Sequence, residues 1–203
     1  MVRATPQIIA ICLVVYVAQL GVALAVGAEQ MAELFALALP LDAQPWTVVT
    51  SVYAHSGPWH LLSNLALFAL LGLAVERKAS ATGVHLYVLA TGAIANVSQV
   101  VFSNVVVSVD AHVLGLSGAI FALIGYVVTG NRLSGFMLDR FEVPHGVQLV
   151  VYLALAVAVT LATAEPGVAI VGHFTGLFLG LVLGAGTVLS ADRLAVEEPP
   201  EHR

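Results

Sequence analysis

Long apolar runs dominate the chain, and short polar segments separate them. Six runs are long enough to form membrane helices, because a spanning helix needs about 20 mostly apolar residues. They cover residues 7–27, 59–75, 84–106, 114–130, 147–164 and 167–190. The segments at the two ends are too short to fold alone. The pattern therefore predicts an all-α integral membrane protein, with a six-helix bundle that forms one membrane-embedded domain over residues 1–203.

The first run also has features of a secretory signal, because Ala23-Leu24-Ala25 is a small-residue pattern typical of a cleavage site. Its apolar stretch, from Ile8 to Val26, is longer than the core of an ordinary signal, which has about 7–15 residues. We therefore favour a retained membrane helix. Cleavage would leave five helices.

The connection between the first two runs, from Ala28 to Pro58, is unusually long and apolar. Its large apolar side chains are those of Leu34, Phe35, Leu37, Leu39 and Trp46. We expect it to be a membrane-associated helical hairpin in the headgroup region, anchored by Trp46 and ended near Pro40 and Pro45. Contact with a substrate is the alternative role for this segment.

Composition and charge exclude several classes of protein. The 203 residues are 60% apolar and only 9% charged, whereas ordinary soluble domains have about 25% charged residues. This rules out a soluble enzyme and a disordered chain. The net charge of −5 leaves no basic surface for nucleic acid. The single cysteine, Cys12, can form no intrachain disulfide.

The cationic residues indicate how the helices cross the membrane. If the N-terminus is cytoplasmic and the connections alternate, all seven cations fall on the cytoplasmic side. They are Arg3, Arg77, Lys78, Arg132, Arg140, Arg193 and Arg203. We therefore expect a multi-pass protein of the cell membrane with both termini in the cytoplasm.

Four polar side chains inside the runs are candidate site residues, because polar groups in the hydrocarbon region are costly and often functional. His60 and Asn64 are four residues apart, on one face of the second run. Ser117 lies at the start of the fourth run, and His173 lies about two turns into the sixth. All four positions are close to the expected outer surface, so we expect the site to open to the external face.

A serine near a histidine is a minimal nucleophile and general base, and the runs contain no carboxylate close to either residue. We therefore predict a Ser117–His173 dyad, with the ring of Phe121 as a candidate to orient the imidazole. The backbone N–H of Ser117 lies at a helix start, where an anion is stabilised. This N–H, His60 and Asn64 are the predicted oxyanion-binding groups.

Glycines surround these residues. Gly115 and Gly118 flank Ser117 and are predicted to support it, while the sixth run has a stripe of four: Gly172, Gly176, Gly180 and Gly184. Small-residue stripes let helix backbones approach closely. We expect the fourth and sixth helices to pack tightly enough for Ser117 and His173 to hydrogen-bond.

Three strings, in this order on alternate helices, resemble those of the rhomboid family of intramembrane serine proteases. They are His55-Ser-Gly-Pro-Trp-His60-Leu-Leu-Ser-Asn64, Gly115-Leu-Ser117-Gly118 and Gly172-His173-Phe-Thr-Gly176. The resemblance covers about residues 46–184. It implies a six-helix fold, with Ser117 as nucleophile, His173 as base and His60 with Asn64 near the oxyanion. It also implies transmembrane protein substrates, cleaved within or beside their spanning segments in the lipid bilayer, and no metal or organic cofactor.

Two positions depart from the family pattern. Trp46 is followed by Thr47, where the family often has a Trp-Arg pair, so the anchoring of that connection is expected to differ. Position 121 is often Tyr in the family and is Phe here, which keeps the ring and removes a hydroxyl. For His55 we expect a structural hydrogen bond rather than a direct part in catalysis.

Other functions fit the sequence less well. A metal-dependent protease would need a His-Glu-x-x-His string, which does not occur, and an aspartyl protease would need two embedded carboxylates. An inactive rhomboid-like protein that binds membrane helices, or a small transporter, are the remaining alternatives. Glu165-Pro166-Gly167 is expected to form a lid over the site, because Pro and Gly favour a loop there.

Overall fold

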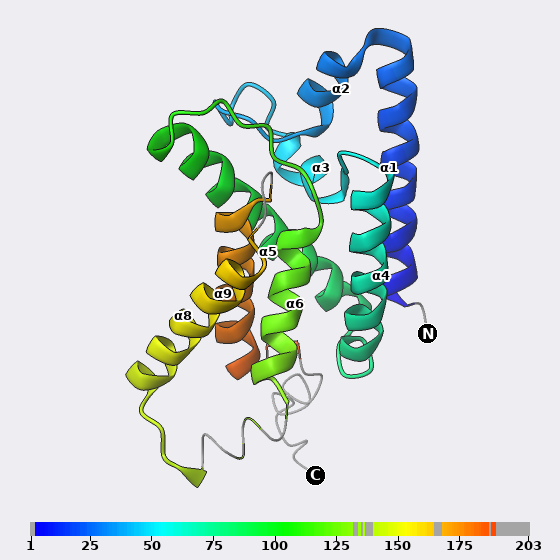
Figure 1. Ribbon diagram of the computed structural model, residues 1–203. Helices are drawn as coiled ribbons and strands as arrows, with labels where there is room; N and C mark the ends of the chain where they lie inside the picture. Colours follow the sequence, from blue (N-terminus) through cyan, green and yellow to red (C-terminus); the bar gives the residue numbers. More distant parts are fainter. Residues whose placement is uncertain are drawn as a thin grey trace, which may run out of the picture.

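The computed structural model describes residues 3–131, 134, 136, 140–164, 168–186 and 188–189. This part of the chain is helical (Figure 1), which confirms the all-α prediction. Its helices are α1 (Ala4–Val26), α2 (Ala28–Phe35), α3 (Thr47–Tyr53), α4 (Pro58–Val75), α5 (Ala81–Val101) with the π-helical segment η1 (Phe102–Val106), α6 (Ser117–Thr129), α8 (His145–Ala162) and α9 (Ile170–Ala185).

Each predicted apolar run overlaps one helix, but the helices differ in length. Four are long and apolar enough to cross a bilayer: α1, α4, α5 with η1, and α8. The other two, α6 and α9, are apolar but have only 13 and 16 residues, fewer than the ~20 of an ordinary span. By length and composition, the described residues thus contain four candidate spans rather than six.

The long connection between α1 and α4 contains α2 and α3, with turns between them. The indole N–H of Trp46, the residue just before α3, donates to the carbonyl oxygen of Leu34 in α2, at 3.2 Å. Leu37 and Val113 exchange two backbone hydrogen bonds, of 2.8 and 2.9 Å. The connection is therefore fastened to the segment that leads into α6. Its contact with lipid stays a prediction.

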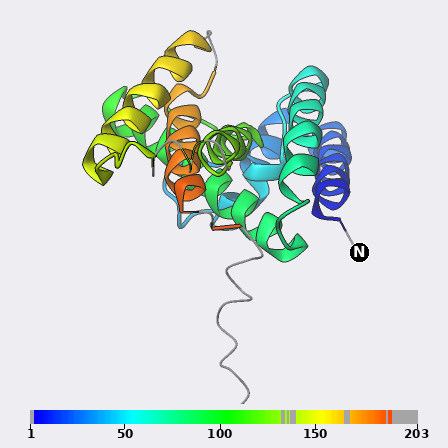
Figure 2. The same cartoon turned by 90° about the horizontal axis from the view of Figure 1, so that it is seen from below.

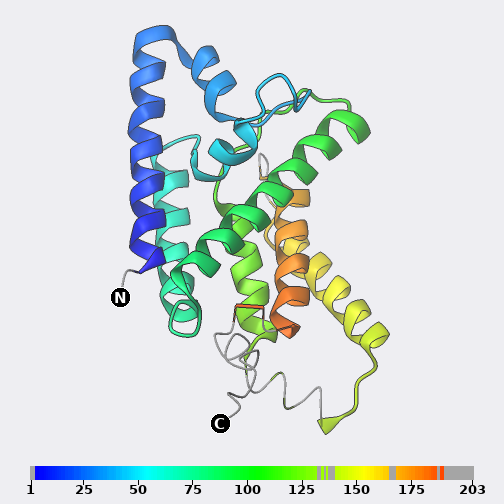
Figure 3. The same cartoon turned by 180° about the vertical axis from the view of Figure 1, so that it is seen from behind.

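The most extensive contact between two helices is that of α6 with α9, which lie side by side in every view (Figures 1, 2 and 3). A Cβ atom added at Gly176 would lie 2.1 Å from the carbonyl oxygen of Gly118, and one at Gly180 would lie 2.0 Å from that of Ala122. Backbone therefore packs on backbone along the glycine stripe, as the sequence predicts.

The other long helices flank this pair. α5 crosses behind it and α8 packs against α9, while α4 and α1 lie on the far side of α6 (Figures 1 and 3). The starts of α4, α6 and α9 lie toward the same side of the molecule in both views. This arrangement is what alternating crossings require, and it brings Ser117, at the start of α6, to the same side as the start of α9.

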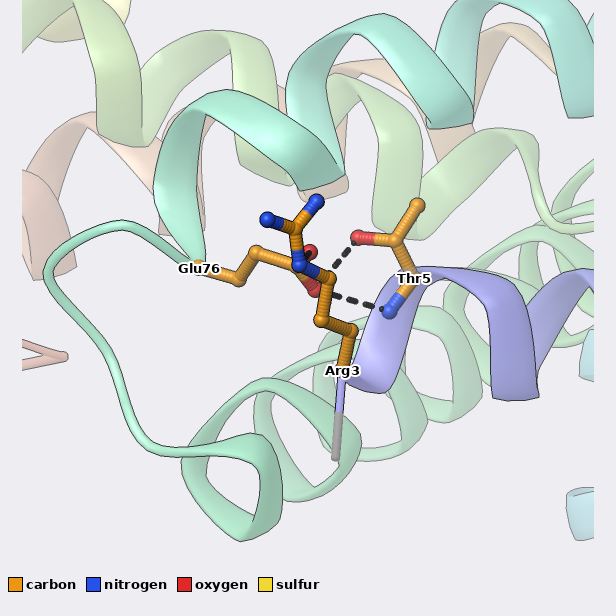
Figure 4. Close-up of polar contacts among 3 residues, drawn as sticks. All are labelled: Arg3, Thr5 and Glu76. Carbon is orange, nitrogen blue, oxygen red and sulfur yellow. Dashed lines mark hydrogen bonds and ion pairs between the residues drawn. The ribbon is translucent and has the colours of Figure 1, made fainter. Parts of the chain in front are cut away.

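On the opposite side of the molecule, polar contacts connect the start of α1 to the end of α4 (Figure 4). The backbone N–H and hydroxyl of Thr5 donate to the carboxylate of Glu76, at 2.9 and 2.8 Å. The guanidinium of Arg3 is 3.9 Å from the same carboxylate. Arg77 and Lys78 follow directly after α4. Three of the seven cations therefore lie at one end of the molecule.

Candidate active site

The starts of α4, α6 and α9 enclose a pocket of about 360 Å³. It is lined by Ser56, His60, Ser63, Asn64, Leu67, Leu114, Ser117, Ile120, Phe121, Val168, Ala169 and His173. Five residues that the sequence analysis singled out are therefore in one place: His60, Asn64, Ser117, Phe121 and His173. Within the described residues, no Asp or Glu lines this pocket.

Ser117 is the first residue of α6, and a bend before it sets its position. Gly115 has a φ of +135°, a conformation that residues with a side chain rarely adopt. Its N–H donates to the carbonyl oxygen of Ser51 at 2.8 Å. A Cβ at Gly115 would lie 3.0 Å from the ring of His60, so the bend and this close approach both require glycine.

Gly118 serves a different purpose from Gly115. A Cβ added there would lie 2.4 Å from the Cβ of Ala95 on α5. The absence of a side chain therefore lets α5 and α6 meet directly behind Ser117.

His173 lies in the first turn of α9, not two turns into the helix as expected, because α9 begins at Ile170 and not at residue 167. Its ring stacks on Phe121, with centroids 4.2 Å apart and planes inclined by 19°. The Nδ1 atom is buried and has no hydrogen-bond partner among the described residues. The predicted lid, residues 165–167, lies outside the described part of the chain.

Ser117 and His173 line the same pocket, but their side chains are not hydrogen-bonded to each other. The hydrogen bonds of the described residues include none between the two side chains. In enzymes without substrate, such contacts are often long and tighten only when substrate binds. The pocket therefore contains both groups, but the hydrogen bond expected from the sequence is not formed in this structure.

His60, in the first turn of α4, is held by Ser56. Its Nδ1 atom lies 3.4 Å from the backbone N–H of Ser56 and 3.0 Å from the Ser56 hydroxyl. Because a backbone N–H can only donate, Nδ1 acts as the acceptor and the ring proton is assigned to Nε2. The Nε2 atom is the one near Gly115, just before Ser117. The sequence analysis gave Ser56 no role.

Asn64 is buried one turn further along α4, with 7% of its surface exposed. One N–H of its side-chain amide donates to the carbonyl oxygen of His60 at 2.9 Å. This bond fixes the amide against the helix. The amide has a second N–H that can donate to another acceptor.

His55 is buried but does not line the pocket. The side-chain amide of Gln19 pairs with its backbone, accepting from the N–H at 3.0 Å and donating to the carbonyl at 3.2 Å. The Nδ1 atom lies 3.1 Å from the carbonyl oxygen of Tyr53. Burial, and secondarily the nearby His60, lower the pKa of His55 to about 4. Its contacts are those of a residue that holds the loop before α4.

Several polar residues in the apolar helices were given no role at the sequence level, among them Gln19, Asn96 and Gln99. The amide of Asn96 donates to the hydroxyl of Ser51 at 3.1 Å, and Gln99 accepts backbone hydrogen bonds from the start of α9. The signal that singled out the site residues, a polar group inside an apolar run, applies equally to these three.

Comparisons with known proteins agree with this geometry. A family model described as the Rhomboid domain matches residues 42–190. The rhomboid protease GlpG of Haemophilus influenzae is 30% identical over 146 residues, which are 70% of each chain. RHOMBOID-like protein 7 of Arabidopsis thaliana is 28% identical over 142 residues, 70% of this chain and 42% of that relative.

A third relative, the rhomboid protease GlpG of Photorhabdus laumondii, is 30% identical over 158 residues, 72% of this chain and 50% of that protein. The chain thus spans half or less of two of these relatives, and 70% of the first. The match to the family model covers most of the chain and includes every residue of the pocket. The chain therefore belongs to the rhomboid family, and this membership together with its apolar helices makes it a multi-pass integral membrane protein.

Proposed function

We propose that this chain is an active intramembrane serine protease in which Ser117 is the nucleophile and His173 the general base. The observation that supports the proposal is the shared pocket, which is lined by a serine at the start of α6 and a histidine in the first turn of α9. Phe121, stacked on the imidazole, limits its rotation. It supplies the orientation that a carboxylate supplies in a Ser-His-Asp triad.

The reaction follows from the two groups. His173 takes the proton of the Ser117 hydroxyl while the oxygen attacks the carbonyl carbon of a peptide bond. The imidazolium then gives that proton to the leaving nitrogen, and the carbon–nitrogen bond breaks. A water molecule, deprotonated by the same imidazole, hydrolyses the acyl-enzyme. Because Nδ1 of His173 is buried, Nε2 is the nitrogen assigned to these proton transfers.

The tetrahedral intermediate carries a negative charge on oxygen, which needs donors. We assign this role to the backbone N–H of Ser117, the Nε2–H of His60 and the free N–H of Asn64. The hydrogen bonds from Ser56 support the required His60 tautomer. Donors fixed in a water-poor site are worth several kcal/mol each to the transition state, of the order of 3 kcal/mol.

The short helices explain how a hydrolytic site reaches into a bilayer. At 1.5 Å per residue, 13 and 16 residues give lengths of about 20 and 24 Å, less than the ~30 Å of the hydrocarbon region. We propose that α6 and α9 complete six crossings within a single domain of residues 1–203. Their starts then lie below the outer surface, and the pocket above them admits water.

Substrate, membrane and orientation are part of the same proposal. A pocket reached from within the bilayer suits spanning segments of other membrane proteins, cut within or beside the membrane. The cations near the start of α1 and the end of α4 support cytoplasmic termini and a pocket open to the external face of the cell membrane.

A serine-directed fluorophosphonate tests the chemistry directly. Wild-type protein should form one adduct, located on Ser117 by mass spectrometry, and Ser117→Ala should form none. His173→Ala should react at least about 100-fold more slowly, because the hydroxyl has lost its base. Labelling that persists in Ser117→Ala would refute the assignment.

Cleavage of a helical membrane substrate tests the activity. Ser117→Ala and His173→Ala should remove cleavage, while insertion and thermal unfolding stay unchanged, and chelators should have no effect. A wild-type protein that binds membrane helices without cutting them would instead be an inactive rhomboid-like protein.

A further inference from the structure

The start of α9 has an unusual arrangement of hydrogen bonds. The residue before the helix is Ala169, whose side chain can accept nothing, although helices usually begin with an acceptor there. The N–H groups of Val171 and Gly172, at the second and third positions, instead donate to Oε1 of Gln99 on α5, at 2.9 and 3.1 Å. A side chain from another helix therefore supplies the missing cap.

The amide of Gln99 is itself held in place. Its Nε2 atom donates to the hydroxyl of Ser103 in η1, at 3.0 Å. This leaves Oε1 as the atom that faces α9, which is the only orientation in which two backbone N–H groups can both be satisfied. An unpaired N–H in a water-poor region is costly, so this cap determines where α9 begins.

The capped turn is the one that carries His173. A Cβ added at Gly172 would lie 3.3 Å from the carbonyl oxygen of Ala95 and 3.5 Å from the Cβ of Gln99. The absence of a side chain at Gly172 thus lets this turn pack against α5, where Gln99 accepts its two backbone hydrogen bonds. Because His173 follows directly after Gly172, the rotation and depth of this turn set where its imidazole lies relative to Phe121 and the pocket.

We propose that Gln99 is a positioning residue for catalysis: by capping α9 from α5, it fixes the turn that presents His173 to Ser117. The inference rests on the proposed function for its catalytic consequence. The cap itself does not depend on that function, and this allows the two to be tested separately.

Three substitutions of Gln99 distinguish the effect of its acceptor oxygen from the effect of its side-chain size. Gln99→Leu removes the acceptor at nearly equal size, and Gln99→Asn keeps the amide but shortens its reach by one methylene. Gln99→Glu retains an oxygen at the same reach, next to the positive end of the helix dipole. We expect Gln99→Leu and Gln99→Asn to lower kcat by about 10- to 100-fold with KM within about twofold, and Gln99→Glu to retain most of the activity.

Thr129→Val is the matched control for stability. The Thr129 hydroxyl donates to the carbonyl oxygen of Leu181 at 2.7 Å, a buried bond to α9 at the end away from the pocket. Its loss should lower Tm without changing kcat. If Gln99→Leu lowers Tm but keeps the wild-type kcat, Gln99 only stabilises the fold, and the positioning role is wrong. Equal losses of kcat in Gln99→Leu and Gln99→Glu would also contradict it.

Amide hydrogen exchange measures the protection of the capped N–H groups and does not depend on catalytic activity. In Gln99→Leu, exchange in peptides covering Val171 and Gly172 should accelerate at least about tenfold, whereas Thr129→Val should leave them unchanged. Unchanged exchange in Gln99→Leu would overturn the inference even in an active enzyme. If wild-type protein neither cleaves nor reacts with a fluorophosphonate, the proposed function fails. Faster exchange in Gln99→Leu would then still show that Gln99 caps α9, but the cap would serve only to stabilise the fold.

Discussion

Polar side chains inside the apolar helices have two kinds of partner in this protein. His60, Asn64, Ser117 and His173 face a pocket, whereas Gln99 satisfies backbone N–H groups of a neighbouring helix. Both kinds are polar groups placed inside apolar helices, so the sequence alone marks them equally. What separates them is the identity of the partner, which depends on tertiary structure.

Asn64→Ala should lower kcat by about 10- to 100-fold and leave KM within about twofold, because the lost donor acts on the transition state. Steady-state cleavage of a membrane-helix substrate measures both constants. Asn104→Ala is the control, since the Asn104 amide makes the same bond to the carbonyl four residues back, 2.9 Å to Val100, outside the pocket. Equal activity in the two variants would remove Asn64 from the oxyanion site.

His55 gives the protein a predictable dependence on pH. Its pKa is lowered by burial from the ordinary 6.5 to about 4, so the folded protein favours the neutral ring. Its contribution to stability is complete above pH 6.5 and is lost as the pH falls toward 4. The Tm in detergent micelles should therefore drop by several degrees across this range in the wild type.

His55→Asn keeps a donor near the carbonyl of Tyr53 and removes the titrating group, so the decrease in Tm between pH 6.5 and 4 should become shallower. His112→Asn, at an exposed position, should preserve the wild-type slope. A slope that is unchanged in His55→Asn would show that other groups govern the acid sensitivity.

At the scale of elements, the contact between α6 and α9 is the least tolerant part of the bundle. Gly180→Ala adds a Cβ that would lie 2.0 Å from the carbonyl oxygen of Ala122, so the helices must separate. We expect a loss of about 1–3 kcal/mol in the free energy of unfolding, measured by denaturant titration. Gly21→Ala in α1 is the control, because nothing lies within 4 Å of the added atom. It should be neutral or slightly stabilising.

Hydropathy predicted the long elements well because burial in lipid requires long apolar segments, whatever their neighbours are. All six runs contain a helix, and the expected depths of His60, Ser117 and His173 in the bilayer predicted that these residues lie together, as they do in the pocket. The start of α9 could not be predicted in this way, because the cap comes from Gln99, distant in sequence. The roles of Ser56 and Gln99 were missed for the same reason.

At the scale of the whole molecule, the two ends of the bundle differ in the segments and charges that they carry. The segment with α2 and α3 lies at the side from which α4, α6 and α9 start, and the loop after α4 lies at the opposite side (Figures 1 and 3). Arg77 and Lys78 belong to that loop, and the positive-inside rule assigns it to the cytoplasm. On the proposed orientation, the segment with α2 and α3 is external.

Single cysteines test this orientation, since Cys12 is buried and can be replaced by Ala. Asp42→Cys, between α2 and α3, should react with a membrane-impermeant maleimide in intact cells, and Lys78→Cys should react only after lysis. Both positions are exposed, so both should label fully once the membrane is opened. The reverse labelling pattern would show that the protein has the opposite orientation, with its pocket open to the cytoplasm. In that case the substrates would have to present their cleaved bonds from the cytoplasmic side.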